Sequence, residues 1–196
     1  RARVQPGETV LVLAAGSGVG SAAIQIARLF GASVIATASG AAKLELACKL
    51  GAEHVVNHLE QDLLAEVRRI TERRGVDVVV EHVGEATWRE SVLLCAKGGR
   101  IVTCGATSGW DARTDLRHVF FRQLSILGST MGSKSVLHKV IDHVRAGRLP
   151  LFPDLAPVGT LRSPDRRPTS ARRVHEATVL PPGNRAGHTS ALDVDR

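Results

Sequence analysis

The residues with the clearest chemical role form a glycine-bearing turn, AAGSGVG, at positions 14–20. Glycines allow the backbone to approach a ligand closely, and the free N–H groups and dipole at the start of a following helix favour negative charge. An apolar run precedes this turn and a helical pattern follows it, as in sites that bind the pyrophosphate of a dinucleotide. We therefore predict a cofactor-binding turn made of Gly16, Ser17, Gly18, Val19 and Gly20.

Two other phosphate or cofactor sites do not fit this turn. A P-loop ends in Gly-Lys-Ser/Thr so that the lysine reaches the terminal phosphates, whereas Gly20 is followed by Ser21 and Ala22. A methyltransferase turn is usually preceded by an acidic residue, but no Asp or Glu occurs between Glu8 and Glu45. A plain structural turn remains the alternative.

The same lack of carboxylates bears on the choice of cofactor. In dinucleotide sites, a carboxylate ~20 residues past the glycines binds the ribose 2′-OH of NAD. Here the expected second strand, 33–37, is followed by Ser39 and Lys43. A hydroxyl and an ammonium group attract a 2′-phosphate that a carboxylate would repel. We therefore expect NADP(H) in preference to NAD(H). In the alternative interpretation, Ser39 caps the next helix and Lys43 is a solvated surface charge.

The turn must be held between a buried strand and a helix. The run at 10–13 is apolar without a break, which is typical of a strand covered on both faces in a parallel sheet. The following segment has apolar residues at helical spacing. We expect the core-facing side of that helix to consist of Val19, Ala22, Ala23, Ile26, Ala27 and Phe30.

Strands and helices continue to alternate after this unit. Six strands separated by helices predict an α/β fold: a Rossmann-type doubly wound parallel sheet with helices on both faces. The remaining strands are expected at 54–57, 77–83, 100–104 and 124–127. The remaining helices are expected at 41–50, 61–74, 87–96 and 135–146, with a short helical turn at 119–121.

Composition excludes several classes of protein. The net charge of +7 comes from scattered basic residues with few aromatic residues among them, so we expect no nucleic-acid partner. No apolar run reaches the ~20 residues needed to span a bilayer, so no membrane association is expected. With no signal peptide apparent, a cytoplasmic location fits. Cys48, Cys95 and Cys104 lack the spacing of a zinc site, so this chain is expected to bind no zinc; Cys48 and Cys95 are expected to be core thiols.

The character of the chain changes near Pro150. Arg, Pro, Ser and Thr dominate the remainder, and hydrophobic periodicity ends. Such a segment cannot bury enough apolar surface to offset its loss of conformational entropy. We therefore expect two parts: a dinucleotide-binding domain at 1–148, and an Arg/Pro-rich tail at 149–196 that is disordered or read out of frame.

Five sequence blocks, in order, resemble the cofactor domain of medium-chain dehydrogenases/reductases, which include zinc-type alcohol dehydrogenases and zeta-crystallin-like quinone reductases. The blocks are GETVLVLAAGSGVGSAAIQIARLFGA, VIATASGAAKLELACKLGAEHVVNH, GVDVVVEHVG, GGRIVTCGA and RQLSILGSTMGS. The resemblance covers residues 1 to about 148. It implies a six-stranded Rossmann domain, a nicotinamide cofactor, hydride transfer, and dimerisation through the sheet edge near residues 126–129.

The resemblance also assigns positions to parts of the cofactor. Ser39 and Lys43 match the 2′-phosphate site of NADPH-using quinone reductases, and His58 stands where those enzymes often have a Tyr against the adenosine. In the alternative interpretation, His58 is an exposed loop residue. The pyrophosphate turn corresponds to Ala15, Ser17, Gly18 and Gly20. The nicotinamide side corresponds to Val83, Gly84, Cys104, Gly105, Ala106, Gly128 and Ser129.

Two departures from the family pattern limit the functional prediction. The family's catalytic domain is expected before residue 1, and the family's return strand and helix are replaced beyond Arg148. We expect the full-length enzyme to transfer hydride between NADP(H) and a small-molecule substrate, either an alcohol or carbonyl or a quinone or enone. No residue here is assigned a catalytic role, and this chain alone is expected to be inactive. The competing hypothesis is a non-catalytic nucleotide-binding fragment or NADPH-responsive module.

Overall fold

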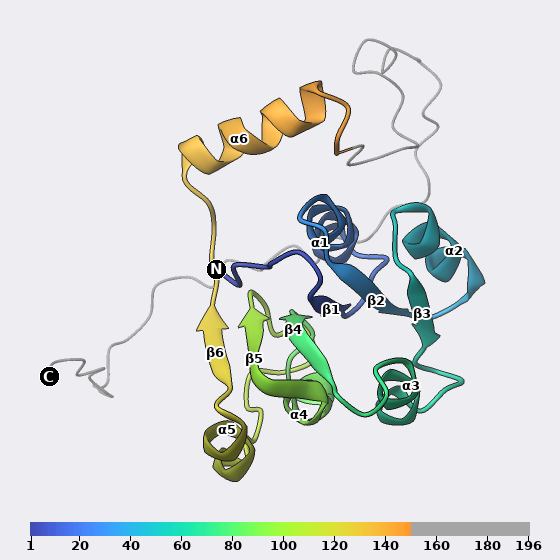
Figure 1. Ribbon diagram of the computed structural model, residues 1–196, viewed down its shortest axis with the longest axis vertical. Coiled ribbons are helices and arrows are strands. Elements are labelled where there is room, and N and C mark those ends of the chain that lie inside the picture. The colour runs from blue at the N-terminus through green and yellow to red at the C-terminus, as the bar shows by residue number, and fades with distance from the viewer. Residues whose placement is uncertain (150–196) are drawn as a thin grey trace, which may run out of the picture. The chain divides into compact units, whose positions relative to one another are not determined.

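The computed structural model describes residues 1–149, and the predictions made for 150–196 lie outside that range. Its centre is a six-stranded sheet in the order β3-β2-β1-β4-β5-β6, in which every neighbouring pair is parallel (Figure 1). This confirms the predicted sheet. The strands are β1 (Thr9–Val12), β2 (Ser33–Ala38), β3 (His54–Asn57), β4 (Val76–Glu81), β5 (Cys95–Thr103) and β6 (Ser125–Gly128).

Helices link the strands and cover both faces of the sheet, as predicted. In Figure 1, α1 and α2 lie on one side of the sheet, and α3 and α4 lie on the other. Within residues 1–149, no helix is both long and apolar enough to cross a membrane. The helices are α1 (Gly18–Leu29), α2 (Ala41–Lys49), α3 (Leu63–Ile70), α4 (Glu85–Leu94), α5 (Leu116–Arg122) and α6 (Lys134–Arg145).

Successive residues of the central strands contribute to two separate cores. Val10 and Val12 pack with Ile24 of α1 and Ala47 of α2 on one face. Leu11 belongs to the other core, which also includes residues of α3 and α4. Side chains alternate between faces along a strand, so a strand buried on both sides must be apolar throughout. This explains why β1 reads as an unbroken apolar run.

The strand order reverses between β1 and β4, and this reversal creates a crevice at the carboxyl end of the sheet. The chain leaves β1 toward α1, which packs on the first core, and leaves β4 toward α4, which packs on the second. The two connections therefore diverge to opposite faces. In open parallel sheets, ligands bind at such a switch point.

The rotation of α1 differs from the expected one. Ile24 and Ala27 are buried, whereas Val19 and Phe30 are 45% and 53% exposed. Gly20 sets this rotation, since it is the buried residue of the first turn and lies one and two turns before Ile24 and Ala27. The apolar spacing of the sequence did not show that a glycine faces the sheet.

The two thiols expected in the core have different environments. Cys95 is buried at the start of β5, as expected, whereas Cys48 is exposed near the end of α2. The expectation for Cys48 was wrong because the neighbouring Ala47 occupies the buried position of that helix. The small apolar residues of α2 do not define a single core-facing side.

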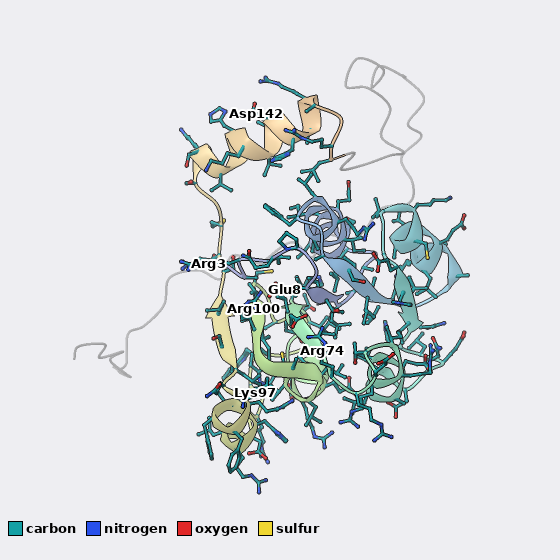
Figure 2. The ribbon with its side chains drawn as sticks, viewed as in Figure 1. Arg3, Glu8, Arg74, Lys97, Arg100 and Asp142 are labelled. Atoms are coloured by element: carbon teal, nitrogen blue, oxygen red, sulfur yellow. The ribbon has the colours of Figure 1, made fainter. Side chains whose placement is uncertain are left out.

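Charged side chains tie the N-terminal segment to the amino end of the sheet (Figure 2). Arg100 donates to Glu8 at 2.6 Å and to the carbonyl of Ala2 at 2.8 Å. Arg74 donates to both carboxylate oxygens of Asp77, at 2.7 and 2.8 Å, and one of these oxygens also accepts from the backbone N–H of Thr9. These contacts are at the end of the strands opposite to the glycine turn.

Candidate functional site

The glycine turn presents backbone donors at the start of α1. Ser17 is the N-cap of this helix, and its Oγ accepts from the N–H of Gly20 at 2.9 Å. The N–H of Ala15 is already bound to the carbonyl of Thr37 at 2.8 Å. By contrast, the N–H groups of Gly18 and Val19 have no acceptor in the part of the chain described here. Free donors at a helix N-terminus bind anions such as phosphate.

The positions of Gly20 and Gly18 in the turn favour glycine for different reasons. A Cβ at Gly20 would lie 2.4 Å from the carbonyl oxygen of Ala14, so the close contact of α1 with β1 requires glycine. A Cβ at Gly18 would meet nothing within 4 Å. Glycine at Gly18 therefore has no packing reason among residues 1–149, but it leaves the space beside the free N–H groups open. Open space beside free N–H groups is what a bound phosphate group requires.

His82, at the end of β4, contacts the glycine turn directly. Its Nε2 lies 3.0 Å from the Oγ of Ser17, and its side chain is largely buried. The contact joins the first turn of α1 to the end of β4 across the switch point. Sequence reasoning missed this pairing, because the two residues are 65 positions apart and nothing in their local patterns links them.

Glu81 organises the loop that leaves β4. Its side chain is fully buried, and its carboxylate accepts from the backbone N–H groups of Val83 and Gly84, at 2.7 and 3.1 Å. The other oxygen accepts from the hydroxyls of Thr87 and Ser91, at 2.8 and 2.6 Å. Since every donor comes from the loop or from α4, this carboxylate fixes the position of both. Its role is structural rather than acid–base.

A cavity of about 700 Å³ lies between the carboxyl ends of β1, β2 and β4 and the helices α3 and α4. Its lining combines apolar side chains with hydroxyl, amide, imidazole and carboxylate groups. Val83 of the predicted nicotinamide side and the predicted residues Ser39 and His58 all line it. The full lining consists of Leu13, Ala14, Thr37, Ser39, His58, Gln61, Asp62, Leu63, Leu64, Val83, Ala86, Thr87, Glu90 and Thr107.

A smaller hollow of about 220 Å³ adjoins the glycine turn and shares Ala14, Ser39 and His58 with the large cavity. Lys43 lies over the turn, since a Cβ at Gly16 would come within 2.8 Å of its Cδ. The structure thus brings together most of the residues predicted for the phosphate and adenosine groups. The hollow is lined by Ala14, Gly16, Ser17, Ala38, Ser39, Lys43 and His58.

The residues predicted for the nicotinamide side occupy the ends of the neighbouring strands. Gly84 has a φ of +93°, and a Cβ there would lie 2.9 Å from the Cα of Ala106, so these two loops are in close contact. Ser129 donates its N–H to the carbonyl of Thr103 at 2.9 Å. Neither cavity described above is lined by Cys104, Gly105, Ala106, Gly128 or Ser129.

Two carboxylates that sequence reasoning did not single out, Asp62 and Glu90, face the large cavity. Burial raises the pKa of Glu90, and the negative charge of Asp62 raises it further, while Arg89 and His58 act in the opposite direction. No local motif marks Glu90, because its importance depends on α3 and α4 packing side by side. Across residues 1–149, no group of three or more His, Cys, Asp or Glu side chains could hold a metal ion.

The switch point, the glycine turn and the order of the strands define a Rossmann-type domain. The family model described as zinc-binding dehydrogenase matches residues 18–146. The chain therefore belongs to this family of oxidoreductases and represents the cofactor domain of medium-chain dehydrogenases/reductases.

Named relatives agree with this assignment. The NAD-dependent alcohol dehydrogenase of Saccharolobus solfataricus is 34% identical over 151 residues, which cover 76% of this chain and 43% of the relative. The quinone oxidoreductase-like protein 2 of Rattus norvegicus is 37% identical over 133 residues, covering 67% of this chain and 38% of the relative. The chain thus spans less than half the length of these relatives.

Solved structures show the same domain. The crystal structure of an NAD-dependent alcohol dehydrogenase is 51% identical and has a TM-score of 0.71, covering 75% of this chain and 43% of that one. A crotonyl-CoA carboxylase/reductase in complex with NADP is 28% identical and also has a TM-score of 0.71, covering 75% and 42%. Relatives named for NAD and a relative holding NADP therefore share this fold.

Proposed function

We propose that this chain binds NADP(H) as the cofactor domain of an oxidoreductase that transfers hydride to or from a small molecule. The single observation that carries the proposal is the continuity of the two hollows. The small hollow is lined by Ser17 of the glycine turn and by Lys43, and it shares Ala14, Ser39 and His58 with the large cavity. This sequence of environments suits pyrophosphate, phosphorylated ribose and adenine in turn.

The chain's own residues would bind and orient the cofactor. Gly18 and Val19 donate their N–H groups to the pyrophosphate, and Ser39 with Lys43 receives the 2′-phosphate. Gly84, Ala106 and Gly128 form the surface that would face the nicotinamide, whereas Val83, which was predicted for that side, lines the large cavity. When bound, the nicotinamide supplies the hydride chemistry, and the protein supplies its position.

The choice of NADP(H) over NAD(H) depends on charge. Lys43 lines the small hollow, and no carboxylate from residues 1–149 lines it. A dianionic 2′-phosphate would be attracted by the ammonium group, whereas a ribose hydroxyl would gain little from it.

The substrate of the whole enzyme, either an alcohol or carbonyl or a quinone or enone, stays a proposal from the family resemblance. So does dimerisation through the edge near residues 126–129.

Calorimetric titration of the 196-residue chain with NADPH and NADH tests this function. We expect tighter binding of NADPH, and the variant Lys43→Met should weaken NADPH binding about tenfold while leaving NADH binding unchanged, because methionine keeps the packing over Gly16 but removes the charge. Lys49→Met makes the same exchange at the other end of α2 and should have no effect on either. Equal affinities in the original chain would contradict the NADP preference, and no binding of either would contradict the function.

A further inference from the structure

The carboxylate of Glu90 faces the large cavity, and no residue in 1–149 donates a hydrogen bond to it. Glu90 lies in α4, its side chain is half-buried, and it lines the cavity beside Ala86 and Thr87. Among residues 1–149, no hydrogen bond or ion pair to its carboxylate is formed. A half-buried carboxylate is less well hydrated than an exposed one, and a ligand that supplies a donor would compensate for the lost hydration.

Glu90 differs from the neighbouring carboxylates Asp62 and Glu81, which already accept hydrogen bonds from the protein. Asp62, on the same cavity, uses one carboxylate oxygen to cap α3 through the N–H of Ala65 at 2.9 Å. Glu81 is saturated by loop and helix donors. Burial and the charge of Asp62 raise the pKa of Glu90, which means that its ionised form is less well solvated than usual. A neutral ligand donor would relieve this cost without adding another charge.

The rest of the cavity suits a flat heterocycle. Leu13, Leu63, Leu64 and Val83 provide apolar surface, and Ser39 connects this space with the hollow at the glycine turn. If the phosphate groups of the dinucleotide lie at that turn, the base enters the cavity between α3 and α4. Glu90 lines this cavity, so its carboxylate is available to a donor at the edge of a base bound there.

We propose that Glu90 accepts a hydrogen bond from the exocyclic amine of adenine and thereby selects adenine among the bases that a dinucleotide could carry. This inference rests on the proposed function, since it requires the dinucleotide to occupy the cavity. A site that hydrogen-bonds a polar group of its ligand discriminates strongly against an analogue that lacks the group, because the buried partner is left unpaired.

The test compares NADPH with an analogue in which hydrogen replaces the adenine amine. For the 196-residue chain, we expect NADPH to bind about tenfold tighter by calorimetric titration. In Glu90→Met, which keeps the chain length but removes both acceptors, the ratio of the two affinities should fall to near one. Because each ratio is measured within one variant, a general loss of stability cancels. Glu60→Met, the same exchange at an exposed site outside the cavity, should keep the original ratio.

Each result has a defined meaning. A ratio near one in the original chain, or an unchanged ratio in Glu90→Met, overturns the role of Glu90 but leaves cofactor binding intact. Binding of neither dinucleotide overturns both the role of Glu90 and the proposed function. The expected pattern is a preference that disappears in Glu90→Met and persists in Glu60→Met.

Discussion

At the residue scale, the site is defined by polar atoms that the protein leaves without partners. The N–H groups of Gly18 and Val19 are donors without acceptors, and the carboxylate of Glu90 is an acceptor without a donor, all within residues 1–149. Elsewhere near the site, polar groups are well satisfied, as Glu81 shows with four donors. Free donors at a helix N-terminus favour an anion, and a carboxylate without a partner favours a donor, so this arrangement suits a ligand that is anionic at one end and carries a donor at the other.

The hydroxyl of Ser17 joins the glycine turn to His82 at the end of β4. Its Oγ already accepts from the N–H of Gly20 and lies 3.0 Å from the Nε2 of His82. The hydroxyl has a single proton, which can be given to His82 or to a phosphate oxygen. A phosphate oxygen that accepts from this hydroxyl would therefore compete with His82 for its proton.

The thiols provide a residue-scale prediction about accessibility. Burial raises the pKa of Cys95 to about 12, whereas Cys48 and Cys104 are exposed. Since the thiolate is the reactive form, we expect two of the three thiols to react with Ellman's reagent at pH 8 in the folded chain. The third should react only after denaturation. Cys95→Ser should keep the full rapid reaction, and a loss of part of it would show that Cys95 is accessible.

At the scale of elements, continuous apolar runs were sufficient to predict the strands. β3 has the predicted bounds, and β1 and β2 differ from the predicted bounds by one residue. The predicted helix at 61–74 was too long at both ends. Asp62 caps the observed helix, and Glu72 and Arg73 take positive φ values of 50° and 66°, which end the helix before Gly75. Apolar spacing does not encode such local backbone choices.

β5 shows a second limit of sequence patterns. It was expected at 100–104 but begins at Cys95, because Cys95 pairs with Val76 before the register shifts and Arg100 pairs with Val78. For the site, the places of the glycine turn, Ser39 and His58 could be predicted because each follows a strand, and Lys43 lies in the first turn of the next helix. Their part in cofactor binding stays a prediction. Glu90 and the contact between Ser17 and His82 could not be predicted, since they depend on which elements the fold brings together.

Glu81 gives a prediction about one element, the β4–α4 connection. Replacing it with Ala leaves two backbone N–H groups and two hydroxyls without their acceptor, so we expect the free energy of unfolding to fall by about 2–4 kcal/mol. Glu81→Gln should cost less, because the amide keeps the volume and the hydroxyls can turn to accept. Urea denaturation measures both. An Ala variant as stable as the exposed control Glu60→Gln would show that this carboxylate does not hold the loop.

At the scale of the whole described domain, stability and binding are placed at opposite ends of the sheet. The ion pairs of Glu8 with Arg100 and of Arg74 with Asp77 are at the amino end of the strands (Figure 2). The glycine turn, both hollows and the β4–α4 loop are at the carboxyl end. Parallel strands make this division possible, because all their carboxyl ends meet at one edge.

This division predicts that Asp77 affects stability and not cofactor binding. Hydrogen bonding to Arg74, with further help from the Thr9 N–H, lowers the pKa of Asp77. A lowered pKa in the folded state stabilises the fold at pH values above the unfolded pKa, and this contribution is lost as the pH falls through the folded pKa. We therefore expect Asp77→Asn to destabilise the chain by about 1 kcal/mol at pH 7, and by progressively less below about pH 4.

Denaturation at several pH values measures this trend, with exposed Asp111→Asn as the control. NADPH affinity at pH 7 should be the same in both variants. A pH-independent difference would show that the carboxylate charge is not what stabilises this edge, and a weaker affinity in Asp77→Asn alone would show that the two edges are coupled.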